Sequence, residues 1–175
     1  MRFPLMTEVF STNADNGEIT VYHATAVKDL KSFDLSKAKR LGDYGPGFYF
    51  STEMEDVEKG LYGSAIYKVV ISISKPLVID DNDPDEQEFN KLCKMFRVDD
   101  DSKEILFDGN PLVEFFALLE HAYPIKSVAN GLTKLGYDSV HVKNSVINER
   151  TPGVKGDYYV IWNQEKVKSI ERVNG

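Results

Sequence analysis

The alternation of hydrophobic and polar positions predicts short strands towards both ends of the chain. Residues 19–25 are rich in β-branched and aromatic side chains, which is typical of a strand, and residues 48–52 repeat this pattern after a glycine-rich loop. Residues 65–78 alternate over a longer stretch and predict one long strand with a solvated face. The C-terminal part adds three further expected strands, at residues 137–142, 158–162 and 166–173.

Helical patterns occupy the middle of the chain. Acidic residues that suit a first helical turn begin the segment 53–62, and a proline in the first turn begins the segment 111–122. The expected helices are residues 53–62, a segment that ends at Met95 after the acidic turn 80–88, residues 111–122 and residues 125–135. Asp99–Asp101 reads as a solvated turn. Strands at both ends with helices between them predict an α+β domain rather than a regular βαβ repeat.

Length and composition fit one globular domain over residues 1–175, with residues 1–18 as a polar lead. The chain has 42% hydrophobic and 28% charged residues, which is ordinary globular usage. The net charge of −7 disfavours non-specific binding to the phosphate backbone of nucleic acids, although a local basic cleft could still bind nucleic acid. The single cysteine, Cys93, excludes an internal disulfide and a thiolate metal cluster, and no metal site is expected.

No stretch approaches the 18 apolar residues of a membrane span, and the N-terminal residues lack the apolar region of a secretory signal. We therefore expect no membrane partner. The expected location is the cytoplasm, either of the producing cell or of a target cell into which the protein is delivered.

The candidate chemistry lies in short segments that follow one another in a defined order. The first is Tyr22–Thr25 on the first strand, and the second is Gly45–Ser51, followed one helix later by Tyr62. The last is Asp157–Trp162 near the C-terminus. A glycine-rich loop that contains Pro46 and lacks the rest of a dinucleotide fingerprint is not a Rossmann loop.

These segments resemble the core of the ADP-ribosyltransferase superfamily, in its diphtheria-toxin and poly(ADP-ribose) polymerase branch. In that branch an H-G-[ST] strand precedes a G-x-G-x-Y-F run and a second tyrosine on the following helix. The third motif is typically a Y-x-x-[FY] strand preceded by glutamate, glutamine or another residue. Toxin-like members from bacterial and phage polyproteins are also similar. The resemblance covers roughly residues 19–72 and 132–170. It implies two packed antiparallel sheets that form an NAD cleft, with helices inserted between the strands, and NAD as co-substrate.

The resemblance also assigns roles to individual residues. It implies that NAD is bound by His23, Ala24, Thr25, Gly47, Tyr49, Phe50 and Tyr62. His23 would hold the adenosine ribose hydroxyls without acting as a base, and the aromatic rings of Tyr49 and Tyr62 would grip the flat nicotinamide. The backbone of Ala24, where the family usually has glycine, would bond the carboxamide. His121 and His141 are read as structural histidines.

The third motif departs from the family pattern. Tyr158 stands where polymerising members have a glutamate, and Asp157 precedes it on a strand that turns the two side chains to opposite faces. The catalytic set is therefore either His23, Tyr49 and Tyr158, or a set in which a bulge turns Asp157 inward. Glu149 is a third candidate. A site without that glutamate predicts transfer of a single ADP-ribose.

The leading hypothesis is therefore a mono-ADP-ribosyltransferase that cleaves NAD and modifies a macromolecular acceptor, either protein or nucleic acid. A toxin or effector is expected, with an antitoxin or immunity protein as a further partner. The segment 143–155, with Lys143, Arg150 and Lys155, is expected to face the acceptor because it precedes the third motif. The alternatives are a catalytically inactive NAD-fold binding module, an NAD glycohydrolase, and an α+β interaction protein without a cofactor.

Overall fold

The computed structural model describes residues 17–38, 42–59, 62–80, 82–105, 111–145 and 156–173. Its strands are β1 (Glu18–Thr25), β2 (Phe48–Ser51), β3 (Ala65–Ser72), β4 (Pro76–Ile79), β5 (Ser139–Ser145), β6 (Gly156–Ile161) and β7 (Val167–Arg172). Its helices are α1 (Met54–Lys59), α2 (Glu86–Met95), α3 (Asp100–Ile105), α4 (Pro111–Ala122) and α5 (Ile125–Lys134), with 3-10 turns η1 (Leu35–Lys37) and η3 (Gln164–Lys166). The α+β prediction is confirmed.

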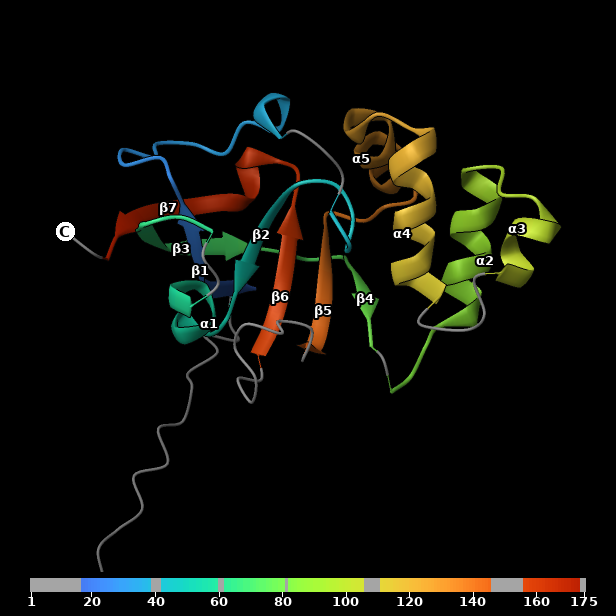
Figure 1. Cartoon of the computed structure of the whole chain (residues 1–175), viewed down its shortest axis with the longest axis horizontal. Helices are drawn as coiled ribbons and strands as arrows, with labels where there is room; N and C mark the ends of the chain where they lie inside the picture. The colour runs from blue at the N-terminus through green and yellow to red at the C-terminus, as the bar shows by residue number, and fades with distance from the viewer. Residues whose placement is uncertain are drawn as a thin grey trace, which may run out of the picture.

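The described strands form one seven-stranded sheet in the order β4-β5-β6-β2-β1-β3-β7. Its two halves meet where Tyr22 of β1 pairs with Ser51 of β2, whereas β1 and β3 pair along their whole length. In Figure 1, β3 and β7 run across the view while β2, β6 and β5 run upright, so the halves have different strand directions. The family resemblance implied two packed antiparallel sheets that form an NAD cleft. The described strands are hydrogen-bonded into one sheet, in which β4 and β5 are parallel.

The long strand predicted over residues 65–78 is wrong, because the structure divides it into β3 and β4. β3 lies between β1 and β7, and β4 lies at the far edge of the sheet beside β5. The break is stabilised by Asp138, whose carboxylate accepts hydrogen bonds from the N–H groups of Ser74 (2.8 Å) and Lys75 (3.1 Å). Pro76 then begins β4, as befits a residue that has no N–H to donate.

The solvated turn predicted at Asp99–Asp101 is also wrong. The carboxylate of Asp99 accepts a hydrogen bond of 2.8 Å from the backbone N–H of Ser102, which is the geometry of a helix N-cap. Asp100 and Asp101 therefore form the first turn of α3, where negative charge is favourable. Of the helix predicted over 53–62, the structure describes Met54–Lys59 as α1, and Tyr62 lies outside a helix.

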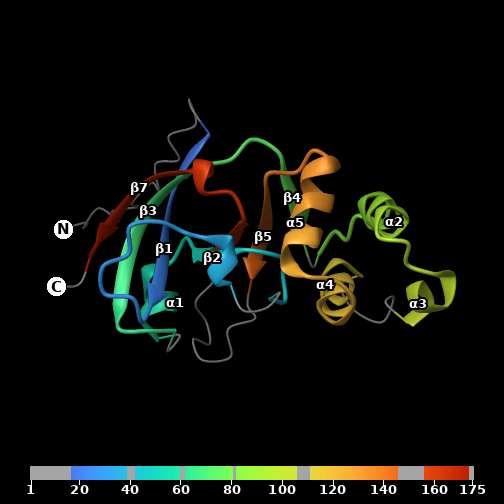
Figure 2. The same cartoon turned by 90° about the horizontal axis from the view of Figure 1, so that it is seen from above.

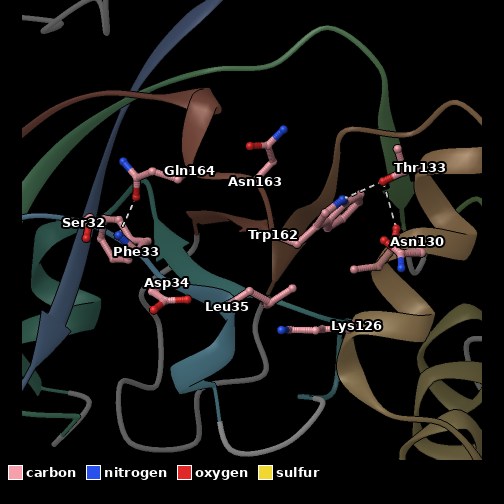
Figure 3. Close-up of a pocket in the computed structure, with 11 residues that line it drawn as sticks. Ser32, Phe33, Asp34, Leu35, Lys126, Asn130, Thr133, Trp162, Asn163 and Gln164 are labelled. Atoms are coloured by element: carbon pink, nitrogen blue, oxygen red, sulfur yellow. Dashed lines mark hydrogen bonds between the residues drawn. The ribbon is translucent and has the colours of Figure 1, made fainter.

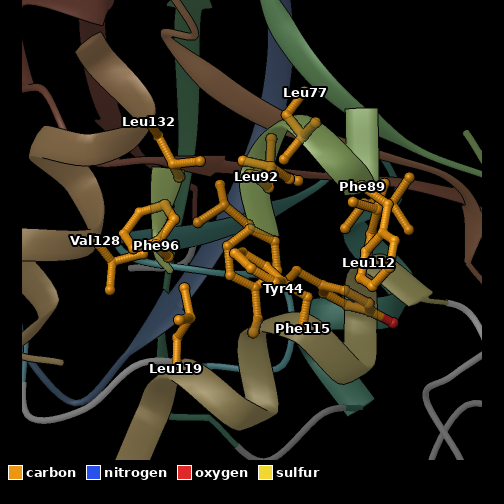
Figure 4. Close-up of a cluster of buried hydrophobic side chains, with 14 of the residues drawn as sticks. Tyr44, Leu77, Phe89, Leu92, Phe96, Leu112, Phe115, Leu119, Val128 and Leu132 are labelled. Atoms are coloured by element: carbon orange, nitrogen blue, oxygen red, sulfur yellow. The ribbon is translucent and has the colours of Figure 1, made fainter. Parts of the chain in front are cut away.

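Buried side chains form a core on each face of the sheet. On one face, α2, α4 and α5 cover the sheet through an aromatic cluster around Phe89, Phe115 and Phe116 (Figures 2 and 4). On the other face, Phe50 and Ile161 pack with Phe33 from the segment that follows β1. None of the helices in the described part of the chain has the length and apolar character needed to cross a bilayer.

Candidate functional site

His23 and Tyr49 are joined through the backbone of β2. Nδ1 of His23 donates a hydrogen bond of 2.8 Å to the carbonyl oxygen of Tyr49. The imidazole lies against the rings of Phe33 and Phe50, with centroid distances of 5.1 and 5.4 Å. Burial among these groups lowers the pKa of His23 below its usual 6.5, more than the bond to Tyr49 raises it. His23 is therefore held as a neutral imidazole with Nδ1 protonated.

The side chain of Tyr49 lies on the opposite face of the sheet from that of Phe50, because neighbouring residues of a strand alternate. Its hydroxyl donates a hydrogen bond of 2.8 Å to the carbonyl of Gly45 and accepts one of 3.1 Å from the N–H of Tyr44. Burial raises the pKa of this phenol well above its usual range, so the hydroxyl stays protonated. Tyr49 thus fastens the glycine-rich loop that precedes its own strand.

Gly47 is required by the same loop. Its φ is +134°, a backbone conformation that favours glycine, and a Cβ at this position would collide with the carbonyl of Ile161 on β6. The Gly-x-Gly run therefore brings the loop directly against the strand of the third motif.

A row of aromatic rings crosses the face that carries His23. Phe50 pairs with Tyr159 between β2 and β6, and Tyr159 pairs with His141 between β6 and β5. The imidazole of His141 stacks on the ring of Tyr159 at 4.5 Å, with an angle of 13° between the planes. Burial raises the pKa of Tyr159 to about 12. Phe50 is only 1% exposed, so its ring supports this row from within the core.

The carboxylate of Asp157 lies on the same face of the sheet as this row of rings. Its Oδ2 lies 2.6 Å from Nε2 of His141, so the acidic residue of the third motif pairs with β5. β6 pairs with β2 without a register shift, and the irregularity in this part of the sheet lies between Val142 and Ser145 of β5. Asp157 and Tyr158 therefore keep opposite faces, as strand alternation predicts.

Tyr158 points to the face of Tyr49, where it meets a residue that the sequence reasoning missed. Its hydroxyl donates a hydrogen bond to Oδ2 of Asp56 in α1. The ring of Tyr44 lies 6.3 Å from the ring of Tyr49 and 6.3 Å from that of Tyr158. Asp56 is 3% exposed. In the sequence it is one acidic residue among several in the first turns of a helix, and nothing marks it as buried.

The other predicted NAD-binding residues lie around the end of β1. Ala24 is buried against Val57 of α1. The hydroxyl of Thr25 accepts a hydrogen bond of 3.3 Å from the N–H of Val27. Tyr62 is 56% exposed and precedes Gly63, whose backbone lies so close to Thr25 that a Cβ there would collide with it.

The expected acceptor-facing segment 143–155 lies mostly outside the described residues, as do Glu149, Arg150 and Lys155. Lys143 is described, and its ammonium lies 4.0 Å from the carboxylate of Asp80.

An open hollow of about 670 Å³ lies at the other end of β6 (Figure 3). Phe33, which contacts His23, forms part of its wall. Trp162, which follows β6, and Lys126 of α5 also line the hollow. The indole N–H of Trp162 donates a hydrogen bond of 3.0 Å to the hydroxyl of Thr133 in α5, which fixes the ring. The volume lies in the range of small-molecule pockets.

Comparison with known proteins adds a family. The profile of a family described as "ADP-Ribosyltransferase in polyvalent proteins" matches residues 14–175. A solved structure described as "Crystal structure of an anti-CRISPR protein" is similar, with a TM-score of 0.48 and 12% sequence identity, over 91% of this chain and 99% of that chain. No curated protein matches the sequence.

Proposed function

This chain belongs to the family of ADP-ribosyltransferases in polyvalent proteins, and from that membership we propose that it transfers a single ADP-ribose from NAD to a macromolecular acceptor. The family match over residues 14–175 is the observation that carries the proposal, because it spans every motif of the candidate site. Transfer of one unit is proposed because Tyr158 stands where polymerising enzymes have a glutamate.

We place the nicotinamide half of NAD on the face of Tyr49 and Tyr158. Aromatic rings there can bind a flat leaving group, and the buried surroundings favour electrostatic stabilisation of the ribosyl cation. The adenosine half is proposed to lie in the hollow at the end of β6, whose Trp162 packs against the same core as Tyr49 and Tyr158. There Trp162 offers an aromatic face for a base and Lys126 a positive charge for a phosphate. His23, on the other face, holds the backbone of Tyr49.

Nicotinamide release from NAD by the full chain is the test of the activity. Transferase activity predicts labelled ADP-ribose on an acceptor in a cell lysate, together with nicotinamide. Nicotinamide and free ADP-ribose without a labelled acceptor would instead establish an NAD glycohydrolase. Binding of NAD without turnover would establish an inactive binding module, and absence of both would reject the proposal.

Trp162 tests where NAD binds. It is the single tryptophan of the chain, so its fluorescence reports on the hollow alone. We expect titration with NAD or with ADP-ribose to quench the emission, and nicotinamide alone to leave it unchanged. The Lys126→Ala variant should weaken the quenching by ADP-ribose. Quenching by nicotinamide alone would reverse the proposed orientation of the dinucleotide.

A toxin or effector acting in a cytoplasm is the proposed setting, with an antitoxin or immunity protein as its partner. Expression in a bacterial host tests this, since an active toxin should arrest growth. The matched variant Tyr158→Phe, which removes one hydroxyl from the proposed nicotinamide side, should relieve the arrest at equal protein levels.

A further inference from the structure

Asp56 is a buried carboxylate whose position calls for a physical reason. It is 3% exposed and, with Ser51 and Ser139, makes up the buried polar and charged residues of the described chain. Burial of a carboxylate is strongly unfavourable unless hydrogen bonds compensate it. Tyr158 supplies such a bond by donating its hydroxyl to Oδ2 of Asp56.

The location of this pair is equally specific. Tyr158 pairs with Ser51 of β2, and Ser51 pairs with Tyr22 of β1, so the Asp56–Tyr158 pair lies where the two halves of the sheet meet. The following residue of α1, Val57, packs against Ala24 and fixes the helix over the end of β1. Asp56 is thus aimed at the third motif by α1.

We infer that Asp56 supplies, through Tyr158, the negative charge of the active site, an inference that rests on the proposed function. The hydroxyl of Tyr158 donates its hydrogen bond to Asp56. This bond increases the electron density on the phenol oxygen, which therefore accepts a hydrogen bond from a ribose hydroxyl more strongly. Asp56 is therefore a positioning residue, and Tyr158 is the group that meets the substrate.

The chemical step defines what this charge does. The C1′–N bond of NAD breaks, its electron pair leaves with nicotinamide, and positive charge develops on the ribose. The acceptor nucleophile then forms the new bond to C1′ and releases its proton to water. A negative charge near the ribose stabilises the transition state more than the ground state, so its effect falls on kcat rather than on KM.

The experiment measures nicotinamide release at varied NAD concentration for the full chain. Asp56→Asn removes the charge at nearly constant shape, and we expect kcat to fall on the order of 100-fold, with KM changed by less than about 3-fold. Asp56→Glu should recover part of kcat. The matched control is Glu58→Gln, which removes one carboxylate charge from the exposed side of the same helix and should stay within about 3-fold of wild type.

Tyr158→Phe keeps the experiment decisive even if Asp56→Asn does not fold, because it removes only the hydroxyl that contacts Asp56. Its kcat should fall about as far as that of Asp56→Asn, and the double variant should be no slower than the slower single variant. A folded Asp56→Asn or Tyr158→Phe protein with wild-type kcat would overturn the inference, and so would multiplicative losses in the double variant. Wild-type protein that releases no nicotinamide would reject the proposed function itself, and this inference with it.

Discussion

On one face of β6 Tyr158 hydrogen bonds to Asp56 of α1, and on the other face the preceding residue, Asp157, pairs with His141 of β5. Each face thus combines an acidic residue with an aromatic ring. Asp56 is 3% exposed, whereas the side chains of Asp157 and His141 are 31% and 17% exposed. Since water screens charges that it can reach, the same chemical group has a larger electrostatic effect on the Asp56 face.

A residue next to a motif in the sequence can belong to another part of the molecule. Asp157 is adjacent to Tyr158, yet it pairs with His141 of β5, whose ring stacks on Tyr159, and so helps to hold β5 to β6. Asp56 is distant in the chain, yet α1 brings it to Tyr158. The face of the sheet, rather than the position in the motif, decides which partner each carboxylate meets.

Phe50→Ala tests how far the packing around His23 depends on the row of rings, and it should lower the free energy of unfolding more than the other substitutions. The fully buried ring contacts both His23 and Phe33, so we expect a loss of about 3–5 kcal/mol in the free energy of unfolding. Urea unfolding followed by circular dichroism measures it. Phe48→Ala, on the same strand but partly exposed, is the control, and an equal loss there would contradict a special role for Phe50.

Tyr49→Phe tests the opposite face, where a hydroxyl fastens the glycine-rich loop. The change leaves the carbonyl of Gly45 and the N–H of Tyr44 without that partner, so we expect a loss of about 1–3 kcal/mol. Urea unfolding measures this loss, and amide hydrogen exchange of Tyr44 should become faster. Unchanged exchange at Tyr44 would show that the loop is held by other contacts.

The elements with strong local patterns could be predicted from the sequence. The strand at His23, the strand at Tyr49 and the helix 111–122 follow from alternation and from helix-start signals, and the structure confirms them. The division of residues 65–78 could not be predicted, because the turn depends on Asp138, more than 60 residues away in the chain.

The candidate site shows the same limit. Strand alternation correctly separates Asp157 from Tyr158, but only the structure shows that Tyr49 and Tyr158 lie on the paired strands β2 and β6. The partners of these residues depend on contacts between distant segments. Asp56 looks like any acidic residue of a first helical turn until the fold brings it to Tyr158, and nothing in the sequence marks His141 as the partner of Asp157.

The neutral His23 predicts a dependence of stability on pH. Its pKa in the folded protein is lowered from 6.5, so below about pH 6.5 the unfolded chain takes up a proton that the folded protein refuses. The contribution of His23 is thus fully present above pH 6.5 and is lost as the pH falls below it. Unfolding free energies at pH 7.5 and 5.5 measure it, and His23→Asn, which keeps an N–H donor, should show a smaller difference between these pH values.

Asp157→Asn should have the smallest effect of these changes, and it tests directly how far water reaches the His141 face. The pair with His141 is partly open to water, so its removal should change the free energy of unfolding by no more than about 1 kcal/mol. A double-mutant cycle with His141→Gln in urea isolates the coupling between the two side chains. Because the coupling is screened, it should decrease as salt is raised from 0.05 to about 0.5 M. A coupling of several kcal/mol that is insensitive to salt would mean that the His141 face is as shielded from water as the Asp56 face, and the distinction between the two carboxylates would then be lost.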